Sequence, residues 1–141
     1  MFTTPYEVHL RWADLDPNFH LRHSSYYDLA SQHRMDMLNS YGLTAAIMEE
    51  QQFAPVLLRE ECIFLREIRA DDKIQIQLTL KDVTNEGTRW TLVHHFTNNK
   101  NKRMAELTVD ISWLNIKSRR IARPLPEIVK DLYNGIMRDI N

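Results

Sequence analysis

The chain has 141 residues, of which 43% are hydrophobic and 26% charged. This length fits one domain, so we expect residues 1–141 to share a single core. The formal net charge of -1 provides no overall basic field of the kind that holds nucleic acid or an anionic membrane. The lone cysteine, Cys62, cannot form an internal disulfide, which excludes a disulfide-stapled secreted scaffold.

The N-terminus and the hydropathy pattern predict a cytoplasmic protein. Residues 2–7 lack the basic and apolar regions of a signal peptide. Charged residues interrupt every apolar stretch, so no segment is expected to span a bilayer. We therefore expect neither nucleic acid nor a membrane as a partner.

The first third of the chain predicts a strand, a polar loop and a helix. Apolar residues at positions 6, 8, 10 and 12 alternate with polar ones, which is typical of a strand with one buried face. Residues 14–23 are rich in polar and turn-forming residues and predict a loop. Ser25 and Asp28 have capping-box spacing, and apolar residues then recur at helical spacing up to Gly42. A helix is predicted from about Ser25 to Tyr41.

The rest of the chain predicts four strands and a terminal helix. The first strand candidate covers residues 56–68, and the next three alternate between apolar and polar residues with turns near residues 85–87 and 98–101. After Pro124 and Pro126, an apolar stripe over residues 128–136 predicts a helix. The predicted inward-facing strand residues are Ile74, Ile76, Leu78, Leu80, Trp90, Leu92, His94, Phe96, Ala105, Leu107, Val109, Ile111 and Trp113.

This order of elements predicts the α+β class. Short connections make the four consecutive strands antiparallel, and the long early helix must bury its apolar stripe against them. A nucleotide-binding α/β fold would need helices between the strands and a glycine-rich phosphate loop, and the sequence has neither.

The loop before the long helix carries the residues suited to catalysis. Asp16, His20 and His23 lie within eight positions of one another, next to the predicted helix start. The free N–H groups at a helix N-terminus can stabilise an oxyanion, and a carboxylate beside them can act as a nucleophile or as a base for water. Thioester hydrolysis requires this combination and needs no metal or other cofactor.

The same segment resembles the hotdog-fold thioesterases of the 4-hydroxybenzoyl-CoA type, including the Tol-Pal-associated acyl-CoA enzymes. Asp14-Leu15-Asp16, His20, His23 and Tyr26 stand at the positions of the family motif, and Arg34 falls where the helix usually has arginine. The resemblance implies a curved antiparallel sheet of about five strands wrapped around the helix, with a C-terminal helix outside. It also implies an acyl-CoA substrate, Asp16 as the catalytic carboxylate supported by His20 and His23, and homodimers or homotetramers with the site at the dimer interface.

Two residues depart from the family pattern. Phe19 replaces the usual glycine, and we expect that it does not easily take a positive φ. Ser31 stands where many members have a helix glutamate. Both substitutions bear on the geometry of the site and on the substrate class.

Several alternatives remain open at this level. The two aspartates could serve only turn and capping chemistry, or could join His20 and His23 as metal ligands. A basic run over residues 117–123 could be a solvated loop or could grip the phosphates of coenzyme A. The substrate could be carried by acyl carrier protein instead of coenzyme A, and the protein could be a non-catalytic acyl-binding hotdog protein.

Overall fold

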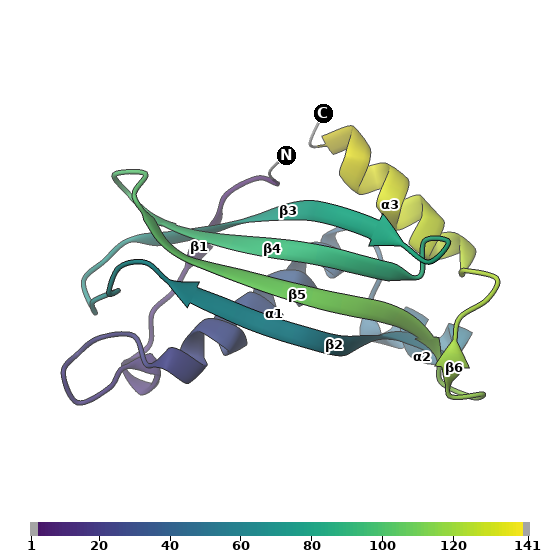
Figure 1. The fold of residues 1–141 in the computed structure, drawn as a ribbon, viewed down its shortest axis with the longest axis horizontal. Helices are drawn as coiled ribbons and strands as arrows, with labels where there is room; N and C mark the ends of the chain where they lie inside the picture. Colours follow the sequence, from purple (N-terminus) through teal and green to yellow (C-terminus); the bar gives the residue numbers. More distant parts are fainter. Residues whose placement is uncertain (1–2, 140–141) are drawn as a thin grey trace.

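The computed structural model describes residues 3–139 and confirms the predicted α+β arrangement (Figure 1). In chain order the elements are β1 (Tyr6–Val8), a 3-10 turn (Trp12–Asp14), α1 (His23–Ser40), α2 (Ala45–Gln51), β2 (Phe53–Phe64), β3 (Ile74–Thr84), β4 (Arg89–Asn98), β5 (Arg103–Asn115), β6 (Arg120–Ile121) and α3 (Glu127–Asp139). None of the helices within residues 3–139 is both long and apolar enough to cross a membrane.

The strands form one antiparallel sheet in the order β1-β3-β4-β5-β2, with β6 paired to the end of β5. The long helix α1 lies against one face of this curved sheet (Figure 1). The C-terminal helix α3 packs beside the end of α1, where Gly135 is so close to the Tyr41 ring that an added Cβ would lie 3.0 Å from it. Both helices therefore cover parts of the core that the sheet leaves open.

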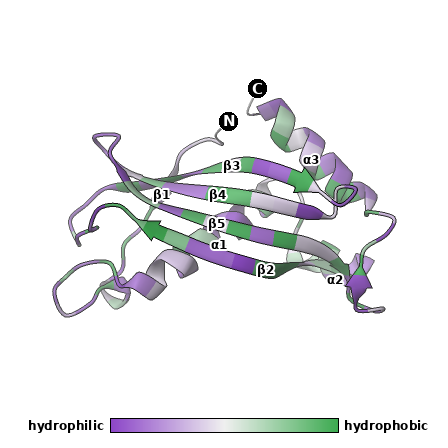
Figure 2. Cartoon of the chain, viewed as in Figure 1, coloured by the Kyte–Doolittle hydropathy of each residue, from purple (hydrophilic) through white to green (hydrophobic). Residues whose placement is uncertain are grey.

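The predicted alternation of the strands is confirmed. Every residue predicted to face inward on β3, β4 and β5 is buried, and Figure 2 shows hydrophobic and hydrophilic residues alternating along these strands. The register places inward-facing residues side by side, as in the row Leu78, His94 and Leu107. Apolar burial on this scale is the main favourable term in folding.

The predicted extent of the first strand was wrong, and one short helix was not predicted. The first strand ends at Val8, and the chain then turns at residues 12–14, leaving Trp12 77% exposed. The turn forms because the Asp14 carboxylate accepts hydrogen bonds from the backbone and the side chain of Arg11. The helix α2 was missed; it starts after Thr44, whose hydroxyl accepts a hydrogen bond from Ile47 N.

The boundaries of α1 and β2 also differ from the prediction. The helix α1 starts at His23 instead of Ser25, and ends near the predicted Gly42, which has a φ of +83°. The strand β2 covers residues 53–64 instead of 56–68, because the chain after Phe64 turns to contact the loop before α1.

A buried polar cluster joins α1 to the sheet. Arg34 Nη1 lies 3.0 Å from His94 Nε2, and His94 Nδ1 lies 2.9 Å from His33 Nδ1. A guanidinium group only donates, so Nε2 of His94 accepts and the proton of that ring is on Nδ1, where it is donated to His33. Both rings are therefore neutral, in agreement with burial, which lowers the pKa of His33 to about 4 and that of His94 well below its usual value.

This cluster predicts a loss of stability in acid. Unfolded histidines take up protons below a pH of about 6.5, whereas the folded His33 and His94 resist protonation to much lower pH. The unfolded state then binds more protons, so the free energy of unfolding should fall between pH 6.5 and about 4, by up to about 1.4 kcal/mol per pH unit for each histidine. Urea unfolding at several pH values measures this slope.

The matched variant is His33→Asn, whose amide oxygen can still accept from His94 but does not titrate in this range. The slope of the unfolding free energy against pH should fall by the contribution of about one proton. This difference separates the contribution of the histidine from that of the carboxylates. Equal slopes for the two proteins would contradict the assignment.

Candidate active site

Asp16 closes the loop before α1 with its own carboxylate. The Oδ1 atom accepts hydrogen bonds from the backbone N–H groups of Asn18 at 2.9 Å and His20 at 3.1 Å. The backbone of Asp16 also exchanges hydrogen bonds with the other side of the turn, to His20 O at 2.8 Å and from Phe19 N at 3.0 Å. Within residues 3–139 the second oxygen, Oδ2, has no hydrogen-bond partner, which leaves it available to a substrate or a water molecule.

The closed loop is held against the segment that follows β2. Leu21 N donates to Ile68 O at 2.7 Å, and Ala70 N donates to Phe19 O at 3.1 Å. Phe19 lies here with a φ of +63°, so the prediction that it avoids the left-handed region was wrong. These backbone hydrogen bonds hold the residue in a conformation that costs about 1–2 kcal/mol without a glycine.

The start of α1 presents free backbone donors next to this loop. The N-cap residue is Arg22, whose side chain makes no capping hydrogen bond to the helix. The predicted capping box is wrong, because Ser25 lies inside the first turn and its buried hydroxyl has no partner in the described structure. Among residues 3–139 nothing accepts from the N–H groups of His23 and Ser24, so the positive end of α1 remains open to a ligand.

Asp16, His20, His23 and Tyr26 all line one cavity of about 350 Å³, which we call the loop cavity. The structure thus brings together the three predicted catalytic residues and the start of α1. The opposite wall is made by residues 64–68 at the end of β2, which the sequence did not indicate. The available signal in the sequence was the apolar Ile68 ahead of a polar turn. In the structure Ile68 is completely buried against the loop.

The floor of the loop cavity is rigid and apolar. Tyr26 is 3% exposed, and its ring meets Phe64 edge-on at 4.9 Å and Phe96 at 5.6 Å. Burial raises the pKa of Tyr26 to about 12, so this hydroxyl stays protonated at neutral pH. At the rim, His20 Nε2 lies 3.5 Å from the exposed carboxylate of Glu67.

The two aspartates of the motif have different surroundings. Asp14 is buried and accepts from Arg11 through both carboxylate oxygens, at 2.8 and 3.1 Å. These hydrogen bonds hold the pKa of Asp14 below its usual value. Asp14 therefore stabilises the turn, whereas Asp16 faces the cavity.

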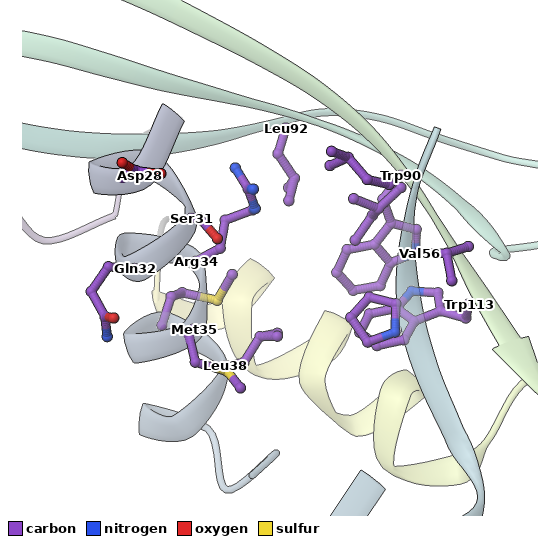
Figure 3. Close-up of a pocket in the computed structure, with 14 residues that line it drawn as sticks. Asp28, Ser31, Gln32, Arg34, Met35, Leu38, Val56, Trp90, Leu92 and Trp113 are labelled. Atoms are coloured by element: carbon purple, nitrogen blue, oxygen red, sulfur yellow. The ribbon is translucent and has the colours of Figure 1, made fainter. Parts of the chain in front are cut away.

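A second hollow of about 530 Å³ follows α1 away from the loop cavity, and we call it the helix groove (Figure 3). It lies between α1 and the sheet, with Trp90, Leu92 and Trp113 on its apolar far side (Figure 3). The helix residues that line it extend from Asp28 to Leu38, a length of about 15 Å along the axis. The loop cavity and the helix groove therefore lie one after the other along the boundary between α1 and β2.

Arg34 and Ser31 are the polar groups of interest in the helix groove. The Arg34 guanidinium is fixed by His94 and by Glu60, whose Oε2 lies 3.5 Å from Nη2. Ser31 lines the groove at the position where the resemblance places a glutamate. A hydroxyl there cannot act as a carboxylate base.

The metal site considered from the sequence would need several ligating side chains close together. Within residues 3–139, no group of three or more histidine, cysteine, aspartate or glutamate side chains is arranged to hold a metal ion.

Comparison with known proteins gives the family. A profile of the thioesterase-like superfamily matches residues 10–132. The chain belongs to this superfamily. The predicted class of thioester hydrolase is confirmed at this level, although no curated protein matches the sequence.

Solved structures show the same fold at low sequence identity. A Staphylococcus aureus protein solved in complex with CoA is 18% identical with a TM-score of 0.87, over 99% of this chain and 87% of that chain. A 1,4-dihydroxy-2-naphthoyl-CoA thioesterase from Synechocystis is 16% identical with a TM-score of 0.84, over 96% and 98%. The DHNA-CoA thioesterase from Staphylococcus aureus is 14% identical with a TM-score of 0.82, over 97% and 91%. The predicted hotdog fold is thereby confirmed.

The contrast between the two aspartates can be tested with isosteric variants. Asp14→Asn should lower the free energy of unfolding by about 1–3 kcal/mol, because it breaks a charge-assisted pair and turns an amide donor toward Arg11. Asp16→Asn keeps the Oδ1 acceptor of the turn and should change stability by less than about 0.5 kcal/mol. Urea unfolding of both variants measures the difference, and equal losses would refute these separate roles.

Proposed function

We propose that this protein hydrolyses acyl-CoA thioesters to a free acid and coenzyme A. The observation that carries the proposal is that Asp16 and the uncapped start of α1 line the same cavity. A carbonyl bound there would have its oxygen at the N–H groups of His23 and Ser24 and its carbon within reach of Asp16 Oδ2. Donors that meet the developing oxyanion commonly contribute a factor of about 10²–10³ to the rate.

The reaction has two possible routes with the same residues. In one, Asp16 Oδ2 adds to the thioester carbon, the C–S bond breaks, coenzyme A leaves as the thiolate, and water hydrolyses the resulting anhydride. In the other, Asp16 takes a proton from water, and the hydroxide adds to the same carbon before the thiolate leaves and is protonated. His20 and His23 would position the attacking water or the carboxylate in either route.

The helix groove is suited to the acyl group of the substrate. It starts near Asp28, about 8 Å along α1 from His23, and its far wall is apolar. An acyl chain or ring leaving the thioester toward α1 would bury its surface there, which is favourable at about 25 cal/mol per Å².

A second copy of the chain would complete the site. The strand β2 is at the edge of the sheet, and among the described strands it pairs only with β5. Leu57, Leu58 and Ile63 on this strand are each about half exposed. A long edge strand with exposed apolar side chains favours pairing with another chain, and we propose a homodimer through β2 that covers the α1–β2 boundary, with a tetramer as a further association.

The activity is tested by free-thiol release from a panel of short, long and aromatic acyl-CoA substrates. Asp16→Asn should lower kcat by at least about a hundredfold, because it removes the nucleophile or base but keeps the hydrogen bonds of the turn. The unfolding free energy of the same variant shows that the fold is intact.

A non-catalytic acyl-binding protein gives the opposite result in this assay. Wild type and Asp16→Asn would then have equal, negligible rates, and the proposal would be rejected.

The proposed dimer is tested by light scattering after size-exclusion chromatography. Leu58→Lys should shift the protein toward the monomer and lower activity in parallel, because the charge would be buried at the β2 contact. Ile121→Lys provides a matched control, since Ile121 is also exposed but lies on β6, which pairs with β5 and not with β2. A wild-type monomer with full activity would count against the second copy.

A further inference from the structure

Two large aromatic rings lie exposed beside the loop cavity. Trp12 is 77% exposed and Phe19 is 55% exposed, and their ring centroids are 5.6 Å apart. Phe19 lies in the loop that Asp16 closes, directly before His20 in the sequence, and Trp12 begins the 3-10 turn that precedes this loop. A contiguous apolar surface of this kind next to a cavity indicates a place where a ligand or partner binds.

The loop keeps Phe19 in this place at a conformational cost. With a φ of +63° the position suits glycine, which would satisfy the same backbone hydrogen bonds without strain. The side chain adds a ring that lies against the Trp12 ring and is 55% exposed. A strained residue that contributes an exposed ring to a site points to a role for that ring.

Arg22, close to the turn that carries Trp12, has no carboxylate partner within the described structure. Arg22 Nη1 donates to Ala13 O at 2.9 Å, and Arg22 Nε donates to Ser24 Oγ at 2.8 Å. Within the described structure Arg22 makes no ion pair, because the nearby Asp14 is already paired with Arg11. Its charge therefore remains available to an anion, beside the turn that carries Trp12 and at the start of α1.

We propose that Trp12, Phe19 and Arg22 bind the nucleotide end of coenzyme A, with the adenine against the rings and a phosphate at Arg22. This inference rests on the proposed function, because it extends a thioester ligand outward from Asp16. Aromatic faces bind nucleobases by stacking, and arginine forms charge-assisted hydrogen bonds with phosphate.

Size and reach agree with this placement. The loop cavity of about 350 Å³ cannot enclose a whole acyl-CoA, so the nucleotide must lie on the neighbouring surface. Trp12 is four residues from Asp16, at most about 14 Å along an extended chain. The pantetheine arm has many rotatable bonds and can bend from the cavity back to the rings.

The basic run over residues 117–123 is a poorer place for the nucleotide within one protomer. It surrounds β6 at the end of the sheet opposite the loop before α1 (Figure 1). Its Arg123 is hydrogen-bonded to Asn85 Oδ1, so that guanidinium is already engaged.

A nucleotide-binding surface would distinguish between coenzyme A and acyl carrier protein as the carrier of the acyl group. Coenzyme A ends in adenosine, whereas the phosphopantetheine arm of acyl carrier protein has no base to stack. A surface that binds adenine therefore favours free acyl-CoA over acyl carrier protein as the substrate.

Tryptophan fluorescence tests binding without turnover. Trp90 and Trp113 are 1% and 0% exposed, so a soluble quencher reports on Trp12. Adenosine 3′,5′-bisphosphate, the nucleotide half of coenzyme A, should change the fluorescence of wild type and protect it from acrylamide. Trp12→Phe should lose this signal. Shielding of Trp12 from acrylamide in the free protein would overturn the proposal, because another surface would then cover the ring.

Kinetics with two carriers test the role in catalysis. The same acyl group is offered on coenzyme A and on pantetheine, which lacks the nucleotide. Trp12→Ala should lower the ratio of kcat/KM for the two substrates about tenfold, through KM for acyl-CoA. Phe19→Gly should lower the same ratio, although glycine relieves the backbone strain and keeps the loop foldable. Ile116→Ala, an exposed apolar truncation elsewhere, should leave the ratio unchanged.

The outcomes separate this inference from the proposed function. Hydrolysis of both carriers with equal kcat/KM in wild type, or an unchanged ratio in both loop variants, would refute the nucleotide surface and leave the thioesterase intact. Nucleotide-dependent quenching in a protein that hydrolyses no thioester would refute the thioesterase and support the surface.

Discussion

The carboxylate of Asp16 and the backbone of its own loop form the interaction on which the candidate site depends. One oxygen accepts from the N–H groups of Asn18 and His20 and so fixes the turn, while the other has no partner among residues 3–139. The same turn is held to residues 68–70 by backbone hydrogen bonds. The structural role and the proposed chemical role therefore fall on the same side chain. The variant Asp16→Asn can separate the two roles, because it keeps Oδ1 as an acceptor and replaces Oδ2 with an amide nitrogen.

The rest of the fold holds this loop against the end of α1. The sheet buries the apolar stripe of α1, and the Arg34–His94–His33 cluster fixes the rotation of the helix relative to β4. Because Tyr26 packs on Phe64 and Phe96, the first turn of α1 cannot shift without disturbing the core. The N–H groups of His23 and Ser24, unpaired within the described residues, are thus held in place in advance of any ligand, as the proposed oxyanion role requires.

The two hollows divide the tasks that a thioester ligand would impose. The loop cavity is small and polar at its rim, and is lined by Asp16, the proposed attacking carboxylate or base. The helix groove is longer and has apolar walls, which suits an acyl group. The exposed rings of Trp12 and Phe19 lie on the outer side of the same loop and offer a third surface. All three meet near the N-terminal end of α1, so the length of the proposed ligand would extend in two directions from Asp16.

The sequence by itself determined the strand alternation of β3 to β5, the long helix, the α+β class and the cluster of Asp16, His20 and His23. These follow from short-range periodicity and from spacing along the chain. It could not decide where β1 ends, that Ser25 is buried instead of capping α1, or that Phe19 takes a positive φ, because contacts with Arg11 or with residues 68–70 control these features. The distinction between a structural Asp14 and an open Asp16 also required tertiary structure. Both are carboxylates in one short motif, and only the position of Arg11 and the end of β2 makes one buried and paired and leaves the other facing a cavity.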